Sequence, residues 1–78
     1  MQIRQLELLG TPSCHLCDLA ETLIAGCLDL SQVKVELIDI AQNDDLIARY
    51  GIKIPVLRCP KSQKELCWPF DELAVKAF

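Results

Sequence analysis

The fold is decided by one stretch, residues 10–17, which read GTPSCHLC. Its glycine and proline are typical of a turn, and Ser13 offers a hydroxyl that can cap the start of a helix. Before this turn, residues 3–9 alternate between polar and apolar side chains and end apolar, which predicts a β-strand. We therefore expect a strand, a tight turn and then a helix that begins at Cys14.

The predicted helix is amphipathic and covers residues 14–28. Its apolar residues recur at spacings of three and four, whereas Asp18, Glu21 and Thr22 lie on the opposite face. After it, residues 33–39 form an alternating, β-branched run of strand length. A strand, a helix and a second strand in this order predict a right-handed parallel unit.

The second half of the chain predicts two further helices and a β-hairpin. Asn43 and Asp44 are both suited to cap a short helix, and Gly51 is suited to end it. The remaining predicted elements are strands over residues 52–59 and 64–68, joined by a turn at residues 60–63, and a last helix over residues 69–78.

The predicted order is strand, helix, strand, helix, strand, strand, helix. The sequence contains no repeat, linker or low-complexity segment, so residues 1–78 predict one domain. Hydrophobic residues make up 51% of the chain, which is enough for a core. We expect an α/β fold whose four-stranded mixed sheet is flanked by three helices.

Charge and cysteine content exclude several classes of protein. The net charge is −3 and the basic residues are scattered, which argues against nucleic-acid binding. Polar residues interrupt the first ten positions, which fit neither a signal peptide nor a membrane span. The chain has five cysteines, and because disulfides use cysteines in pairs, this odd count argues against a secreted disulfide scaffold. We expect a cytoplasmic monomer that binds neither nucleic acid nor membranes.

Cys14 and Cys17 lie at the first turn of the predicted helix. Unpaired N–H groups and the positive end of the helix dipole stabilise a thiolate there, and the thiolate is the attacking species. Cys17 follows one turn later on the same face and can attack a mixed disulfide formed by Cys14. A bridge this short stabilises a fold by only about 2 kcal/mol. The pair therefore predicts redox chemistry, with Cys14 as nucleophile and Cys17 as resolving thiol.

Two motifs together resemble the glutaredoxin-like branch of the thioredoxin superfamily. The first is TPSCHLC at residues 11–17, and the second is IKIPVL at residues 52–57. The resemblance covers nearly the whole chain and is to short bacterial members. It implies a thioredoxin-like fold and a thiol–disulfide oxidoreductase of cell redox homeostasis. It also implies that Pro55 is a cis-proline facing the cysteines, and a cis bond would leave the backbone of Ile54 free to pair with an extended substrate.

The resemblance points to Lys53 and to an acidic pair as further substrate-binding residues. Lys53 stands where glutaredoxins carry threonine, and a cation there would favour a thiolate; a solvated surface lysine is the alternative. Asp71 and Glu72 resemble the acidic pair that receives the glutamyl group of glutathione. Favourable charges in the first turn of a helix are the alternative for this pair.

Three departures from the family pattern bear on glutathione and on the redox site. Glutaredoxins carry Gly-Gly before the acidic pair, where this chain has WPF at residues 68–70, and Pro-Tyr between the cysteines, where it has His15 and Leu16. Leu8 stands where thioredoxins have a buried acid. We expect no tightly bound cofactor and no metal, and a protein or small-molecule disulfide as substrate. Glutathione or a reductase stays open as the partner that supplies electrons.

Other functions and the remaining cysteines have alternative interpretations. Cys14 could hold zinc or an iron–sulfur cluster, although a second closely spaced ligand pair is missing. A docking module without enzymatic activity could use the surface near Trp68. Cys27 is expected in the core, whereas Cys59 and Cys67 either face one another across the predicted hairpin or pack in the core.

Overall fold

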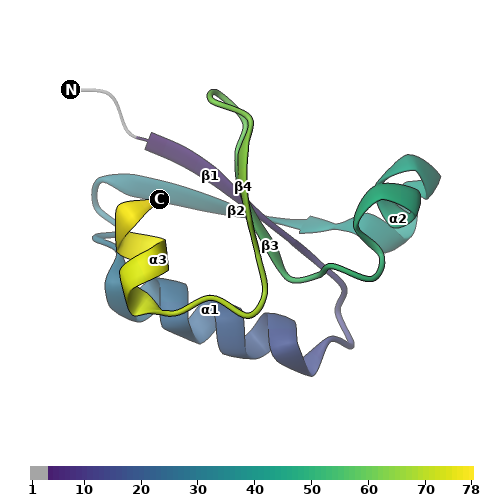
Figure 1. The fold of residues 1–78 in the computed structure, drawn as a ribbon, viewed down its shortest axis with the longest axis horizontal. Helices are drawn as coiled ribbons and strands as arrows, with labels where there is room; N and C mark the ends of the chain where they lie inside the picture. Colours follow the sequence, from purple (N-terminus) through teal and green to yellow (C-terminus); the bar gives the residue numbers. More distant parts are fainter. Residues whose placement is uncertain (1–3) are drawn as a thin grey trace.

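The computed structural model describes residues 4–78, and it has the predicted α/β architecture with a four-stranded mixed sheet and three α-helices. Residue 3, the first of the predicted strand, lies outside the described residues. Along the chain the elements are β1 (Arg4–Gly10), α1 (His15–Cys27), β2 (Val33–Asp39), the 3₁₀-helix η1 (Ile40–Gln42), α2 (Asp44–Tyr50), β3 (Val56–Cys59), β4 (Lys64–Cys67) and α3 (Glu72–Ala77) (Figure 1).

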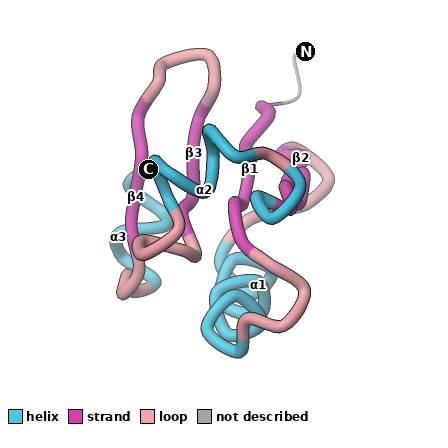
Figure 2. Tube along the Cα trace, turned by 90° about the vertical axis from the view of Figure 1, so that its right-hand side faces the viewer, coloured by secondary structure: helices cyan, strands magenta, loops and turns pink. Residues whose placement is uncertain are grey.

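The sheet has the strand order β2-β1-β3-β4. β1 and β2 are parallel, and Gly10 at the end of β1 lies opposite Asp39 at the end of β2. β3 is antiparallel to both β1 and β4. Because parallel strands end at the same edge of a sheet, the loop that follows β1 and the end of β2 meet where α1 begins (Figures 1 and 2).

A hydrophobic core lies on each face of the sheet. Because successive strand residues point to opposite faces, the neighbours Leu8 and Leu9 belong to different cores. The core under α1 and α3 consists of Leu6, Leu8, Ala20, Ile24, Leu57, Cys59, Phe70 and Val75. The smaller core, beside α2 and η1, consists of Leu9, Ile40, Tyr50 and Val56.

A polar network lies on the same sheet face as the smaller core. Arg58 donates to the Glu7 carboxylate through Nε at 2.9 Å and Nη2 at 2.6 Å, and its pKa is raised chiefly by this hydrogen bond. The Tyr50 hydroxyl donates to the Glu65 carboxylate. These contacts join β1, α2, β3 and β4.

The starts of three elements differ from the predictions. The cap of α1 is Cys14, so the prediction of Ser13 was wrong. β3 begins at Val56 because the preceding segment folds back onto α2, where the N–H groups of Lys53 and Ile54 both donate to the Tyr50 carbonyl, at 2.8 and 3.1 Å. The last helix begins later than predicted, at Glu72, and η1 was not predicted.

Cys59 and Cys67 do not face one another. Cys59 lies opposite Lys64 in the ladder, whereas Cys67 lies opposite Val56. The two cysteines are therefore an odd number of rungs apart and point to opposite faces of the sheet. Cys59 is buried in the larger core and Cys67 is exposed.

None of the helices in the described part of the chain is long and apolar enough to cross a membrane.

Candidate active site

The Cys14–Cys17 pair forms a disulfide at the start of α1, with the two Cα atoms 5.2 Å apart. Cys14 is the N-cap residue, and its sulfur accepts a hydrogen bond from the backbone N–H of Cys17 at 3.1 Å. Cys14 is half-buried, whereas only 8% of the Cys17 surface is exposed. The two sulfurs therefore differ in access to solvent, and the more accessible one receives an N–H group of the helix start.

Gly10 makes room for the inner sulfur. A Cβ atom added at Gly10 would lie 2.5 Å from Cys17 Sγ, closer than packed atoms allow, and 3.2 Å from Cys17 Cβ, which is a tight contact. From the sequence, Gly10 is predicted only as a residue of the turn after the first strand. Its contact with Cys17 depends on α1 folding back against β1, which spacing along the chain does not show.

The loop before β3 contains three of the predicted substrate-binding residues. The Ile54–Pro55 peptide bond is cis and Pro55 is buried. The N–H of Ile54 already donates to the Tyr50 carbonyl, so only the Ile54 carbonyl is left for a substrate, and the expectation of a free backbone does not hold for the N–H group. The Pro55 carbonyl accepts from the N–H of Trp68 at 3.0 Å, and Lys53 is exposed.

The acidic pair at the start of α3 is engaged within the fold. Asp71 caps α3 by accepting the N–H of Ala74 at 2.8 Å, and Glu72 forms an ion pair with Lys76 at 3.0 Å. Both contacts fit the alternative interpretation of first-turn charges.

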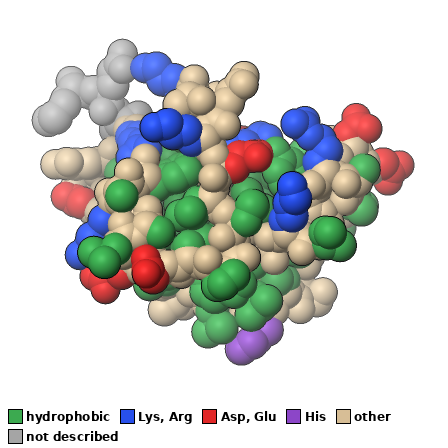
Figure 3. All heavy atoms as spheres, in the orientation of Figure 1, with side chains coloured by type: hydrophobic (Ala, Val, Ile, Leu, Met, Phe, Trp, Pro, Cys, Tyr) green, Lys and Arg blue, Asp and Glu red, His purple; other side chains and the backbone are tan. Residues whose placement is uncertain are grey.

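The segment that replaces the Gly-Gly pair of glutaredoxins packs against the protein itself. The rings of Trp68 and Phe70 meet edge to face with centroids 5.0 Å apart, and Phe70 is buried in the larger core. The Trp68–Pro69 peptide bond is cis, as is that before Pro55. Between the two cysteines, His15 and Leu16 are exposed, and hydrophobic side chains gather around the single histidine on the face shown in Figure 3.

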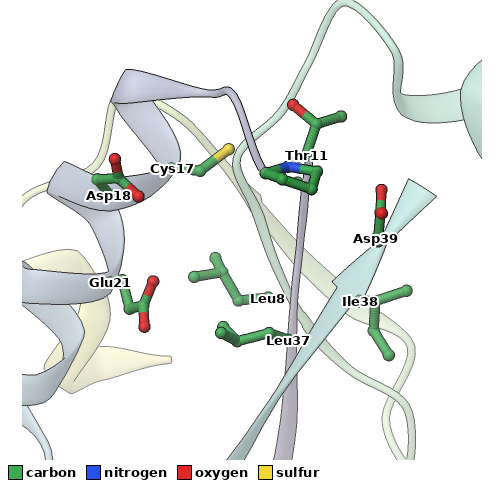
Figure 4. Close-up of a pocket in the computed structure, with 10 residues that line it drawn as sticks. Leu8, Thr11, Cys17, Asp18, Glu21, Leu37, Ile38 and Asp39 are labelled. Atoms are coloured by element: carbon green, nitrogen blue, oxygen red, sulfur yellow. The ribbon is translucent and has the colours of Figure 1, made fainter. Parts of the chain in front are cut away.

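A cavity of about 210 Å³ opens beside Cys17, on the side of β2. Figure 4 shows that it lies between α1 and the carboxyl ends of β1 and β2. By helical spacing, Asp18 and Glu21 lie on the outer face of the predicted helix, and no local pattern connects them with Asp39. The lining residues are Leu8, Gly10, Thr11, Pro12, Cys17, Asp18, Glu21, Leu37, Ile38 and Asp39.

Within residues 4–78, no group of three or more His, Cys, Asp or Glu side chains is arranged to hold a metal ion. A zinc site with four ligands from this chain alone would need such a group.

Comparison with known protein families identifies one family. Residues 5–78 match the family model of the Glutaredoxin-like domain (DUF836). A structural genomics target protein from X. campestris is 35% identical, and its crystal structure gives a TM-score of 0.81 with 92% of this chain and 91% of that chain covered. Its solution structure gives a TM-score of 0.77, covering 92% and 87%.

A solution structure of a protein from Nitrosomonas europaea is 29% identical, with a TM-score of 0.81 over 99% of this chain and 92% of that one. No curated protein sequence matches the chain significantly. With a thioredoxin-like fold and a family match over nearly its whole length, the chain belongs to the Glutaredoxin-like domain (DUF836) family.

Proposed function

We propose that this protein is a thiol–disulfide oxidoreductase that uses Cys14 as nucleophile and Cys17 as resolving thiol. The observation that carries the proposal is the place of the Cys14 sulfur at the N-cap of α1, where it accepts the Cys17 N–H. In the reduced protein, a thiolate at this position would be stabilised by the helix N–H groups and by the helix dipole. Cys17 is nine-tenths buried and within bonding reach of Cys14.

The proposed reaction proceeds in two exchanges. The Cys14 thiolate attacks one sulfur of a substrate disulfide, so a Cys14–substrate disulfide forms and one substrate thiolate leaves and takes up a proton. The Cys17 thiolate then attacks the Cys14 sulfur, which releases the second substrate thiolate and closes the Cys14–Cys17 disulfide. Two electrons pass from the protein to the substrate, and an external thiol reductant returns them.

For the substrate we propose a protein or small-molecule disulfide that docks against the loop before β3. The Ile54 carbonyl is the backbone group free to pair with it, Pro55 lies beside it, and Lys53 is the exposed cation on this loop. Asp71 would contribute only charge, because its carboxylate caps α3. We expect this activity in the cytoplasm, with glutathione or a reductase as electron donor.

Mass spectrometry across a glutathione redox buffer tests the proposal. The wild-type protein should lose the mass of two hydrogen atoms reversibly as the buffer becomes oxidising, because glutathione disulfide accepts two electrons and two protons, with a midpoint near the poise of the cytosolic glutathione pool. Cys14→Ser and Cys17→Ser should each abolish this loss. Cys67→Ser, which removes an exposed free cysteine of β4, should not. If no Cys14–Cys17 disulfide forms at any poise, dithiol catalysis is excluded.

A further inference from the structure

The cavity beside Cys17 has acidic side chains from two different elements. Asp18 and Glu21 come from α1, and Asp39 comes from the end of β2. They line one cavity because Asp39 lies opposite Gly10 in the sheet, and Gly10 in turn lies against the Cys17 sulfur. Figure 4 shows the three carboxylates around the opening of this cavity.

Among residues 4–78, no Lys, Arg or His lines this cavity. Lys34 lines the adjoining cavity together with Glu21. Both ion pairs observed among residues 4–78, Arg58 with Glu7 and Lys76 with Glu72, lie elsewhere. One oxygen of Asp39 accepts the N–H of Ala41 at 2.9 Å.

The redox pair forms part of the same wall. Only 8% of the Cys17 surface is exposed, yet Cys17 lines the cavity. The apolar residues that line it include Leu8 and Leu37, which lie opposite each other in the sheet. A group bound here would lie next to the resolving sulfur, in a site that is apolar at its base and negative at its opening.

The space continues along the groove between α1 and β2. A second cavity of about 370 Å³ shares Leu8, Glu21 and Leu37 with the first. Leu30 and Leu37, both in its lining, are 57% and 58% exposed. An apolar part of a substrate could therefore extend away from Cys17 while its charged group stays at the acidic end.

We propose that the cavity beside Cys17 binds a positively charged group carried by the disulfide substrate, so that the protein favours cationic disulfides. This inference rests on the proposed oxidoreductase function and specifies its substrate class. The occupant is an ammonium or guanidinium group within reach of the reacting sulfurs. The carboxylates attract it, and the small volume suits a single side chain or a compact amine.

A cation in this cavity would act on the second exchange. At that step the Cys17 thiolate attacks the Cys14 sulfur of the Cys14–substrate disulfide. The nearby carboxylates repel a thiolate at Cys17, and a bound positive charge offsets that repulsion. The bound cation is neither formed nor consumed, so the bonds made and broken are those of the proposed two exchanges.

Three small disulfides of similar size test the inference. They are cystamine, which is cationic, bis(2-hydroxyethyl) disulfide, which is neutral, and 3,3′-dithiodipropionate, which is anionic. Each would be reduced by the wild-type protein with a thiol reductant supplying electrons. We expect kcat/KM for cystamine to exceed that for the neutral disulfide by about threefold to tenfold, as for one or two partly exposed charge pairs. The anionic disulfide should be slower than the neutral one.

Charge variants assign the preference to the cavity. Glu21→Gln should lower the cystamine-to-neutral ratio, and Glu21→Lys should bring it to one or below. Glu36→Gln is the matched control, because Glu36 is an exposed acid of β2 that does not line the cavity. It should leave the ratio unchanged. Two disulfide-linked peptides that carry lysine or glutamate beside the cysteine then show whether the charged group comes from a protein or only from a small amine.

The outcomes separate the inference from the function on which it rests. If the neutral disulfide is reduced but cystamine is not preferred, the inference is wrong and the oxidoreductase function stands. If the preference for cystamine survives Glu21→Lys, it arises from the net charge of the molecule, and the proposed role of the cavity is wrong. If none of the disulfides is reduced and no Cys14–Cys17 disulfide interconverts, both proposals fail.

Discussion

At the residue scale, Gly10 is the position where a single added atom disturbs the redox pair. Because a Cβ at this position would lie 2.5 Å from Cys17 Sγ, Gly10→Ala must push the sulfur or the strand aside. We expect the oxidised variant to lose about 1–3 kcal/mol of unfolding free energy, as for other overpacked cores. Urea unfolding of the oxidised protein measures this loss.

Gly26 provides the control for that substitution. It lies in α1, and a Cβ added there meets nothing within 4 Å. Gly26→Ala should therefore stabilise the protein by about 0.5–1 kcal/mol through helix propensity. Adding Cys17→Ala to Gly10→Ala should recover part of the loss, because the clashing sulfur is gone. An equal loss in both backgrounds would contradict the steric explanation.

The lowered pKa of the Cys59 thiol leads us to expect that stability depends on pH. The Ser62 hydroxyl hydrogen bond, followed by its backbone N–H, lowers the pKa of the Cys59 thiol, and these donors outweigh burial, which acts in the opposite direction. The folded state therefore releases this proton at a lower pH than the unfolded state. The resulting stability is fully present above the unfolded pKa of about 8.5 and is lost as pH falls through the folded pKa.

Ser62→Ala tests this direction. Removal of the hydroxyl should return the pKa of Cys59 towards its ordinary value. The difference in unfolding free energy between wild type and variant should grow from neutral to alkaline pH, as measured by urea unfolding of the oxidised protein at several pH values. A difference that is constant with pH would mean that Ser62 stabilises the turn without acting on the thiol.

At the scale of the elements, variants at the cap of α3 can distinguish a structural role of Asp71 from a role in substrate binding. Its carboxylate caps a helix of only six residues. Asp71→Ala should cost about 1 kcal/mol, whereas Asp71→Asn keeps a capping oxygen and should cost little. Glu72→Ala, which breaks an exposed pair, should cost about 0.5 kcal/mol or less.

Disulfide reduction by the Asp71→Asn variant is the second measurement. The variant keeps the cap and loses the charge, so a change in KM with unchanged stability would assign the charge to substrate binding. An equal loss of stability in the Ala and Asn variants would show that the cap is not what Asp71 contributes.

The elements also show what local sequence can and cannot predict. Alternation identified β1 and β2, and Asn43 was one of two residues proposed as the cap of α2, because strand faces and capping side chains act over a few residues. The late start of β3 depends on hydrogen bonds to Tyr50, and the cap at Cys14 depends on how the loop enters α1. Both are set by tertiary contacts that local propensity does not contain.

For the whole molecule, the same distinction separates the redox pair from its surroundings. Cys14 and Cys17 could be identified from spacing alone, because both belong to one helical turn. The acidic cavity is lined by Asp18 of α1 and Asp39 of β2, and the parallel pairing of β1 with β2 brings these two elements to the same cavity. A site assembled from different elements in this way depends on which residues of neighbouring strands lie opposite one another. The sequence predicts the order of the elements but not this register.

The two cores also predict how the whole fold responds to reduction. The Cys14–Cys17 disulfide joins residues three apart, while buried side chains on both sheet faces hold the strands together. A loop this short restricts the unfolded chain little, so reduction should lower the unfolding free energy by no more than about 2 kcal/mol. The reduced protein should stay folded. Urea unfolding with and without dithiothreitol measures the change, and the Cys14→Ser variant should match the reduced protein.

That small difference matters for function, because an oxidoreductase must fold in both redox states. By the thermodynamic cycle, the free energy of unfolding lost on reduction equals the free energy by which folding favours the disulfide. Each 1.4 kcal/mol of it lowers the reduction potential of the pair by about 30 mV. A loss of at most about 2 kcal/mol therefore leaves the protein able to give and receive electrons near a thiol buffer. A reduced protein that unfolds without urea would make the disulfide a structural bridge and would contradict a catalytic role for the pair.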